Sequence, residues 1–512
     1  MMNEKFEDYQ YDSCISRGIC SVNPRTSSLQ EVLILYLKIA AHYALKQYEN
    51  NIQNKDLKSL ILNTISIMVS NSDFSESDFE SITAVFNRML PDIIYEDNNL
   101  EHLKSVLKSN KKADIIKSIR LGEKEFLKLV KDVSQETRDL YRILFVIAKS
   151  ICINVLNLES FDIDEPEGYL TILKLLNSLN YNKQEELLEE IQTAAEVDNC
   201  LMKLMRETQE KRYGKHGIED VSYTTTPAKA ILVVGSNIRE LEDVLEAVKD
   251  KQIDVYTHDD MMLAHTFPKF KEYKNLKGQY GQGIENCLLD FATFPGPIVL
   301  TRHSLHNVEN LYRGRLYTTD FTYSKGIVQI KNKDFSEVIE AALQTKGFKT
   351  GKLCETVTVG YDFEAAMQEI DKKIKNHSRI FLIGLNSYTI EQWTYFDKLF
   401  RTIPNDVLVV SLSYCALKEN IICLNACFDS FAIIEFAEAL HKNYNLPLTV
   451  FFPKCDRHTM SQMIYLSTQE NIGIYVGKCT PMILNPNLIN TLTPLFGIKG
   501  LTSAKKDLNE II

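Results

Sequence analysis

The sequence predicts a multidomain α and α/β protein, with an N-terminal helical bundle followed by two doubly wound, Rossmann-like parallel-sheet domains. Up to about residue 225, apolar side chains recur at helical spacing and Gly and Pro are sparse. Beyond that point, short β-branched runs alternate with amphipathic stretches, as in α/β domains. The length of 512 residues suits about three domains. We therefore expect a helical domain at 1–225 and α/β domains at 226–375 and 376–512.

The helical part begins with a capping signal. Ser28 and Glu31 have the spacing of a capping box, in which each side chain satisfies a backbone N–H at the start of a helix. We expect a helix to start there, because an apolar face follows from Leu29 to Tyr43. Further helical patterns occur at 57–69, 79–90, 140–156, 169–179 and 184–196.

The α/β part contains short, mostly apolar runs that predict strands buried on both faces of parallel sheets. These runs are 231–235, 254–258, 298–301, 357–361, 380–384, 407–413, 448–452 and 473–477. Ligands of open parallel sheets bind beyond the carboxyl ends of the strands, and polar residues follow several of these runs. They include Ser236, Asp260, Ser304, Asn386, Tyr414, Asp456 and His458. The alternative explanation is ordinary turn chemistry.

Composition and charge exclude several classes of protein. Lys and Arg number 58 against 68 Asp and Glu, a net charge of −10, so we expect no nucleic-acid partner held by overall charge. The apolar run 143–153 is interrupted by Lys149 and is too short to span a bilayer, so we expect no membrane association. The polar, acidic N-terminus is unlike a signal peptide, and we expect a cytoplasmic protein whose 11 cysteines are reduced.

Several motifs resemble one family. Residues 256–268 contain Tyr-Thr-His-Asp-Asp-Met followed by Ala-His and Pro268, and 278–283 read Gly-Gln-Tyr-Gly-Gln-Gly. With 291–298, 334–339, 446–448 and the spacing of Cys14 and Cys20, they resemble the hybrid cluster (prismane) proteins, known as hydroxylamine reductases, over nearly the whole chain. The resemblance implies a helical domain, two α/β domains and an N-terminal cubane iron–sulfur cluster. It also implies a hybrid iron–sulfur–oxygen cluster held by one His, two Glu and four Cys, with a Lys nearby.

Most positions of those hybrid-cluster ligands carry other residues here. Ser236 stands for the His, Asp260 and Asp456 for the two Glu, His458 for the Lys, and Ser304, Asn386 and Tyr414 for three Cys, while Cys427 alone is kept. Iron is bound well by soft, anionic thiolates, whereas Ser and Asn are neutral and Tyr has a pKa near 10. We therefore predict that the hybrid cluster is absent in its family form and that hydroxylamine is not reduced by the family mechanism.

The N-terminal site keeps two of the four cysteines that the resemblance implies, Cys14 and Cys20. Two thiolates cannot hold a cubane alone, but two chains related by a two-fold axis could supply four. We expect a 4Fe–4S cluster that bridges a homodimer, by analogy with related carbon monoxide dehydrogenases. The alternative is a pair of reduced thiols.

If the fold is kept, a second metal site could form in the interdomain cleft. Asp260, Cys427, Asp456 and His458 would then converge, and together they can satisfy zinc or a non-haem iron. The alternative is a polar pocket filled by water and internal hydrogen bonds. His258 and His265 belong to the matching motif but to no ligand set, and we expect them to orient the loop after the strand.

Three functions remain open, and the sequence does not decide whether the chain is an enzyme. The first is an iron–sulfur or metal-dependent redox protein that works with a redox partner protein. The second is a metal-free pseudoenzyme that binds a small molecule or serves as a partner subunit. The third is a hydrolytic or lyase-type enzyme with a single zinc or iron. The first ranks ahead because Cys14 and Cys20 persist at the family's spacing.

Overall fold

The computed structural model describes most of the chain. Its described residues are 24–69, 75–90, 114–180, 183–281, 286–304, 309–321, 326–384, 390–413, 415, 418–426, 429–453, 457–477 and 488–512. They form two compact units. The helical unit comprises the described parts of Met1–Leu201, Asp456–Tyr465 and Thr480–Thr491, and the sheet unit comprises those of Met202–Cys455, Leu466–Cys479 and Leu492–Ile512.

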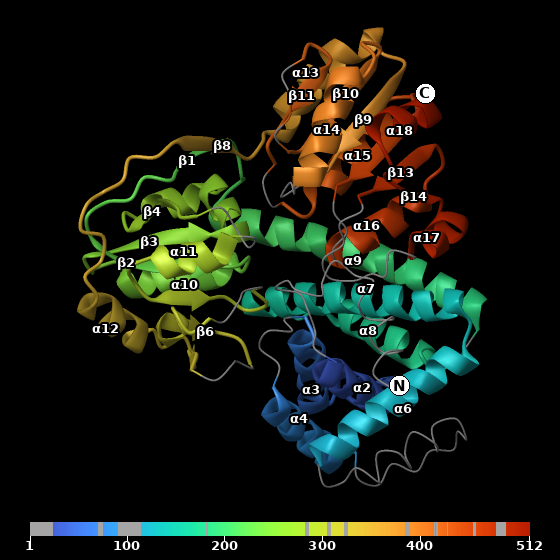
Figure 1. The fold of residues 1–512 in the computed structure, drawn as a ribbon, viewed down its shortest axis with the longest axis vertical. Helices are drawn as coiled ribbons and strands as arrows, with labels where there is room; N and C mark the ends of the chain where they lie inside the picture. The colour runs from blue at the N-terminus through green and yellow to red at the C-terminus, as the bar shows by residue number, and fades with distance from the viewer. Residues whose placement is uncertain are drawn as a thin grey trace. The chain divides into compact units, whose positions relative to one another are not determined.

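Long helices build the helical unit (Figure 1). They are α2 (Pro24–Glu49), α3 (Lys55–Ile67), α4 (Glu76–Met89), α6 (Ile115–Asp132), α7 (Gln135–Ser160), α8 (Pro166–Ser178), the first part of α9 (Gln184–Tyr213) and most of α16 (Arg457–Ser467). Side-chain caps start several of them: Asn54 caps α3, Asp114 caps α6, and Ser75 with Asp78 forms a capping box on α4.

The predicted helix start at Ser28 is wrong. Helix α2 already begins at Pro24, and Ser28 lies within it at 1% exposure. Proline suits the first turn because it has no N–H to leave unsatisfied and its φ is already helical. Helix α6 also helps to bury Ser28. A Cβ atom added to Gly122 of α6 would lie only 1.9 Å from the Ser28 carbonyl oxygen. Helices α2 and α6 therefore approach each other closely at this point.

Helix α7 supplies much of the core of the helical unit. Ile143, Leu144, Ile147 and Ile151 on it are fully buried. By length and composition α7 could also cross a membrane, but 72% of its most apolar 18-residue window is buried within the protein. The core helix of a globular protein can be equally long and apolar.

Two parallel six-stranded sheets dominate the sheet unit. The first has the order β4-β3-β2-β5-β6-β7 and the second the order β11-β10-β9-β12-β13-β14. The strands of the first sheet are β2 (Lys229–Val234), β3 (Ile253–His258), β4 (Leu276–Gln279), β5 (Ile298–Leu300), β6 (Leu316–Thr318) and β7 (Val328–Gln329). Those of the second are β9 (Arg379–Ile383), β10 (Val407–Ser411), β11 (Ile421–Cys423), β12 (Leu448–Phe452), β13 (Ile472–Val476) and β14 (Ile498–Gly500).

Helices accompany both sheets. They are α10 (Ile238–Val248), α11 (Cys287–Thr293), α12 (Ser336–Gln344), α13 (Phe363–Lys373), α14 (Ile390–Thr402), α15 (Ala432–Asn443), α17 (Ile489–Phe496) and α18 (Ala504–Ile511), with short 3-10 turns η2 (Asp259–Thr266), η3 (Pro268–Glu272), η5 (Arg313–Arg315) and η6 (Ile374–Asn376). Helix α12 packs on β2, and α15 packs on β9 and β12. Nearly every residue of β2, β9, β10 and β12 is buried, as strands covered on both faces require. The predicted helical bundle followed by two doubly wound domains is confirmed.

One predicted strand pairs differently from expectation. Residues 357–361 were expected in a parallel sheet, but β8 (Thr356–Val359) pairs antiparallel with β1 (Glu219–Ser222), with Glu219 opposite Val359. Three of the four β8 residues are exposed, so this strand does not belong to a sheet covered on both faces. Strand β1 also precedes residue 226, where the first α/β domain was expected to begin. The proposed domain boundaries stay predictions.

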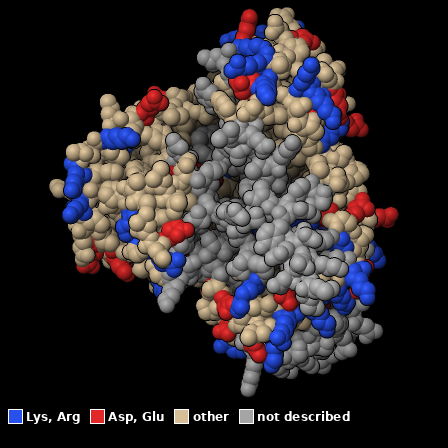
Figure 2. Space-filling view, in the orientation of Figure 1, with Lys and Arg blue, Asp and Glu red and all other residues tan. Residues whose placement is uncertain are grey.

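Charges of both signs occur on the surface. On the face drawn in Figure 2, basic and acidic side chains of the described residues lie close together and form no continuous basic stripe.

Candidate functional site

The carboxyl edge of the first sheet holds the predicted positions Ser236 and Ser304. The turn after β2 begins with Gly235, whose φ of 117° favours glycine. A Cβ there would lie 2.2 Å from the Ser304 hydroxyl oxygen and 2.3 Å from that of Thr301. Asn237 then caps α10 by accepting a hydrogen bond from the Glu240 N–H, and Ser236 between them is exposed.

Ser304 is committed to the sheet itself. Its side chain is 5% exposed, and its hydroxyl oxygen lies 3.0 Å from the Val234 carbonyl oxygen and 2.5 Å from that of Thr301. Thr301 also donates its hydroxyl to Val234, at 2.8 Å. A neutral hydroxyl that donates to backbone carbonyls ties the ends of β2 and β5 together. This arrangement does not fit the role of an iron-binding thiolate.

Two backbone N–H groups of the loop after β5 have carboxylate partners within the sheet unit. The backbone N–H of Arg302 donates to Glu240 at 2.9 Å, and that of His303 donates to Asp320 at 2.9 Å. Buried N–H groups need such partners, and carboxylates are strong acceptors. The carboxylates of Glu240 and Asp320 therefore hold the backbone of this loop.

The loop after β3 is held by its two histidines. His258 is fully buried, with its Nε2 atom 3.1 Å from an Asp290 carboxylate oxygen and its ring against Phe291. His265 Nε2 lies 2.8 Å from the hydroxyl oxygen of Thr257, and burial lowers the pKa of His265 to about 4. Both side chains thus hydrogen-bond within the first α/β domain, as expected for residues that orient the loop.

The predicted cleft ligands are only partly described. Asp260 is half-buried at the start of η2 in the sheet unit. His458 belongs to the helical unit, where its Nδ1 atom lies 2.8 Å from the Ser150 hydroxyl oxygen. Cys427 and Asp456 lie outside the described residues, as do Asn386, Tyr414, Cys14 and Cys20. Among the described residues, no three His, Cys, Asp or Glu side chains are grouped as a metal site. The convergence of these four ligands stays a prediction.

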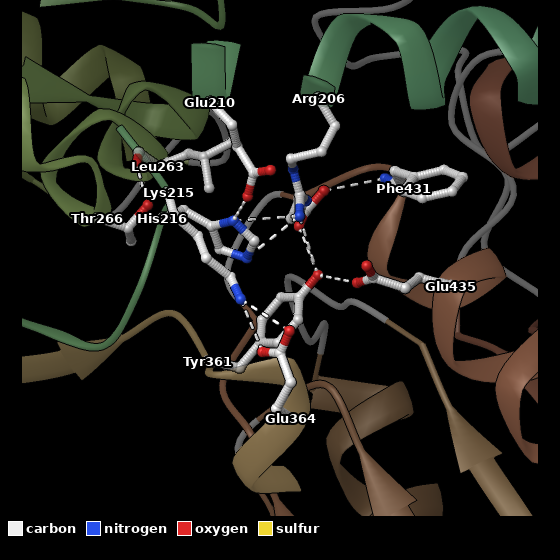
Figure 3. Close-up of polar contacts among 11 residues, drawn as sticks. Arg206, Glu210, Lys215, His216, Leu263, Thr266, Tyr361, Glu364, Phe431 and Glu435 are labelled. Carbon is white, nitrogen blue, oxygen red and sulfur yellow. Dashed lines mark hydrogen bonds and ion pairs between the residues drawn. The ribbon is translucent and has the colours of Figure 1, made fainter. Parts of the chain in front are cut away.

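A buried polar cluster that the sequence did not reveal lies elsewhere in the sheet unit (Figure 3). Arg206, near the end of α9, forms an ion pair with Asp429, and the two side chains are 6% and 4% exposed. Tyr361, just after β8, has its hydroxyl 3.1 Å from Arg206 Nη1, 3.0 Å from Asp429 Oδ2 and 2.7 Å from Glu435 Oε2. His216 Nε2 lies 3.2 Å from Arg206 Nη1. We call these residues the Arg206 cluster.

The charges of the Arg206 cluster are set by its burial. Burial raises the pKa of Tyr361, and Glu435 adds to that rise, so the phenol keeps its proton and donates it. Burial and the Arg206 guanidinium lower the pKa of His216, although Glu210, 2.5 Å from its Nδ1 atom, opposes this shift. The guanidinium therefore faces the Asp429 carboxylate and a neutral phenol, as a buried cation requires.

The Arg206 cluster fixes the chain next to the predicted ligand Cys427. Asp429 follows that cysteine by two residues and accepts a hydrogen bond from the Phe431 N–H at 3.0 Å. Before the cysteine, the Asn425 carbonyl accepts from the Gly360 N–H at 2.9 Å, and Asn425 also donates to Thr358. Strand β8 and the two residues after it therefore contact the chain at Asn425 and at Asp429, on either side of residue 427.

Comparisons with known proteins agree with this architecture. Two curated hydroxylamine reductases are each 26% identical to the chain. That of Thermodesulfovibrio yellowstonii matches over 98% of both chains, and that of Mannheimia succiniciproducens over 97% of this chain and 96% of its own. Among solved structures, carbon monoxide dehydrogenase IV from Carboxydothermus hydrogenoformans superposes with a TM-score of 0.50 at 12% identity, covering 96% of this chain and 88% of the other. At that identity the superposition speaks for the fold alone.

A match to a family model shows which family the chain belongs to. The model described as the prismane/CO dehydrogenase family matches residues 10–418, which is most of the chain. The N-terminal helices, the whole first sheet, the motifs after β3 and the strands β9 and β10 of the second sheet lie within that match. The chain belongs to the prismane/CO dehydrogenase family.

Proposed function

We propose that this chain is a redox protein that lacks the hybrid cluster in its family form and does not reduce hydroxylamine by the family mechanism. The observation that carries the proposal is the hydroxyl of Ser304, which contacts the carbonyls of Val234 and Thr301 at a position where the resemblance implies a cysteine ligand. A thiolate at this position would bring a soft, anionic donor for iron. The serine supplies a neutral donor that is already used within the protein.

The neighbouring positions support the same proposal. Ser236 is exposed on the turn that caps α10, where the resemblance implies a histidine ligand. Asp260 is one methylene shorter than the implied glutamate, so a metal would have to sit closer to the η2 backbone. Iron–sulfur clusters are held by several thiolates at once, and the loss of several donors together is not compensated by the others.

For electron transfer we propose a 4Fe–4S cluster shared between two chains. Cys14 and Cys20 supply two thiolates per chain, and a cubane takes four, so the donor set fits a homodimer and not a single chain. Such a cluster would supply one-electron transfer. We further propose a cytoplasmic location, which keeps thiols reduced, and a redox partner protein as the electron donor.

Anaerobic purification followed by iron, sulfide and zinc analysis tests the proposal. We expect about two irons and two sulfides per chain, a dimer, and no hydroxylamine-dependent oxidation of a reduced viologen dye. Cys14→Ser should remove the colour and weaken the dimer, whereas Cys200→Ser, at an exposed thiol on α9, should change neither.

Other outcomes separate the remaining functions. An intact mixed oxo–sulfido iron centre, or hydroxylamine-dependent turnover, would overturn the proposal. One zinc per chain without iron would favour the single-metal enzyme at Asp260, Cys427, Asp456 and His458. A colourless, metal-free protein would favour the partner subunit or small-molecule binder.

A further inference from the structure

A group of lysines lies at the amino edge of the first sheet, where its parallel strands begin. Ser236 and Ser304 follow the ends of strands, so they belong to the opposite edge. The chain between α12 and β8 runs along the outer side of this sheet in Figure 1. It contains Lys346, Lys349 and Lys352, which are all exposed.

Backbone and aromatic contacts hold this segment at the start of β2. The Phe348 N–H donates a hydrogen bond to the Ala228 carbonyl at 2.9 Å. Thr225 and Lys352 exchange two backbone hydrogen bonds, at 3.0 and 3.1 Å. The Phe348 ring also packs against three other aromatic rings, those of Tyr256, Tyr280 and Phe294. The three lysines therefore extend from a backbone that is fixed to the sheet.

Two more exposed lysines lie at the same edge. Lys251 precedes β3 by two positions, and Lys274 precedes β4 by two. The Asn275 side chain donates to the Lys251 carbonyl at 3.0 Å, which joins the starts of these two strands. The hydroxyl of Thr226, just before β2, donates to Asp254 of β3 at 2.5 Å. The starts of β2, β3 and β4 are thus connected, and their lysines share one edge.

The ammonium groups at this edge are not neutralised by nearby carboxylates. Among the residues that the structure describes, none forms an ion pair with Lys251, Lys274, Lys346, Lys349 or Lys352. We call these five residues the lysine edge. Asp254 is already engaged by Lys277 at 3.6 Å, and the exposed Asp250 and Glu355 only partly offset the five positive charges. The edge is therefore positive on a chain whose net charge is −10.

An apolar side chain stands among these charges. Leu353 directly follows Lys352 and is 90% exposed. Leu343, near the end of α12, is 51% exposed. An exposed leucine gains free energy when a partner covers it, and protein interfaces combine such apolar contacts with a charged rim. A protein partner can cover Leu353 and neutralise the lysines at once, whereas a free phosphate can only do the second.

We propose that the lysine edge and Leu353 form the docking surface for a small acidic electron-carrier protein. This inference rests on the redox partner of the proposed function and names its chemistry. Opposite charges steer such a partner to the edge, since most of the remaining net charge of the chain repels it. A long polyanion or an anionic membrane would extend beyond the edge and meet that repulsion.

Calorimetric titration of the full-length protein tests the proposal. The probes are oxidised flavodoxin and oxidised plant-type ferredoxin, two acidic electron carriers, so that binding is measured without electron transfer. We expect binding that weakens about tenfold or more when the salt concentration rises from about 20 to about 200 mM, because salt screens exposed charges.

Two triple variants separate local charge from net charge. The first reverses three charges of the lysine edge: Lys346→Glu, Lys349→Glu and Lys352→Glu. The matched control reverses three exposed charges on α13 and α18: Lys372→Glu, Lys505→Glu and Lys506→Glu. Both change the net charge equally. The first should weaken binding about tenfold or more, and the control should leave it within about twofold.

Zero-length cross-linking locates the interface. A carbodiimide joins a lysine amine to a carboxylate of the carrier as an amide, with loss of water, and peptide mapping should find the bond at Lys346, Lys349 or Lys352. Leu353→Ser should weaken binding while leaving its salt dependence unchanged, because this change removes apolar contact and no charge.

The outcomes keep this proposal apart from the proposed function. Cys14→Ser should bind the carriers as the wild type does, so a metal-free chain that still binds them would overturn the cluster and not the docking surface. Equal weakening by both triple variants, cross-links only at other lysines, or no binding of either carrier would overturn the docking surface. Binding of heparin or anionic vesicles in place of the carriers would assign the edge to a polyanion or a membrane instead.

Discussion

At the scale of single residues, the hydroxyl of Ser304 joins the ends of two strands of the first sheet, β2 and β5. The Ser304 hydroxyl is short enough to lie against Gly235 and to donate to the Val234 carbonyl. Sulfur is larger and a weaker hydrogen-bond donor, so a cysteine would not replace these contacts. The local packing of the β2 and β5 ends is therefore built around a hydroxyl.

Gly235 should tolerate no side chain. Gly235→Ala places a Cβ 2.2 Å from the Ser304 oxygen at a φ of 117°, and we expect it to lower the free energy of unfolding by more than about 1 kcal/mol. Gly314→Ala is the matched control, because no heavy atom lies within 4 Å of its added Cβ. Urea denaturation followed by circular dichroism measures both. Equal midpoints for the two variants would contradict the described packing.

His265 should make the first α/β domain sensitive to acid. Burial lowers its pKa from 6.5 to about 4, so below pH 6.5 the unfolded chain binds a proton that the native protein does not. The stability contributed by the neutral imidazole is full above pH 6.5 and is lost as the pH falls towards 4. In His265→Gln, the urea midpoint should fall less between pH 7 and 5 than in the wild type. An unchanged fall would show that another group is responsible.

At the scale of elements, the Arg206 cluster joins α9, the segment after β8 and the start of α15. These pieces are far apart in the sequence: Tyr361 lies 155 positions after Arg206, and Asp429 lies 68 positions after Tyr361. A buried ion pair contributes little net stability compared with apolar packing, but it is strongly destabilising when one partner is removed. The cluster therefore specifies which segments pack together.

A double-mutant cycle should reveal this coupling. Arg206→Met leaves the buried Asp429 carboxylate unpaired and should cost about 3–5 kcal/mol. Asp429→Asn keeps an oxygen for the Phe431 N–H, and the double variant should be less destabilised than the sum of the two single variants. Unfolding free energies of the four proteins measure the coupling. Strict additivity would show that the guanidinium and the carboxylate do not depend on each other.

The elements themselves differ in how far the sequence predicts them. The apolar run 231–235 predicts β2 to within two residues, because a strand buried on both faces must be apolar throughout. The prediction that residues 357–361 form a strand of a parallel sheet was wrong, because alternating Thr and Val suit a half-exposed, two-stranded ribbon. Strands such as β7, with two residues, are too short for any pattern. Arg206 escaped prediction because its partners are distant in sequence.

At the scale of the whole molecule, the helical unit is assembled from separate parts of the chain. Asp198, fully buried, accepts hydrogen bonds from Asn154 at 2.8 Å and from Ser461 at 2.5 Å. Asp139, also buried, accepts one from Thr491 at 2.8 Å. Two buried carboxylates of the N-terminal segment thus depend on hydroxyls from the C-terminal part of the chain.

A fragment that ends at Leu201 should therefore be less stable than the helical unit in the intact protein. Each lost hydrogen bond to a buried carboxylate should cost about 1.5–3 kcal/mol. We expect the fragment to unfold at a lower urea concentration, and full-length Ser461→Ala and Thr491→Val should reproduce part of the loss. A fragment as stable as the intact unit would contradict this assembly.

The divided origin of the helical unit also orders the events of biosynthesis. Its N-terminal helices are translated first, but Ser461 and Thr491 leave the ribosome only after every strand of the first sheet and most strands of the second. Domains normally fold as they are synthesised, N-terminal first. Here the earliest helices cannot complete these hydrogen bonds until residue 491 has emerged. Until then, the carboxylates of Asp139 and Asp198, which are buried in the folded protein, stay exposed to water. The first sheet of the nascent chain can fold ahead of the helical segment that precedes it.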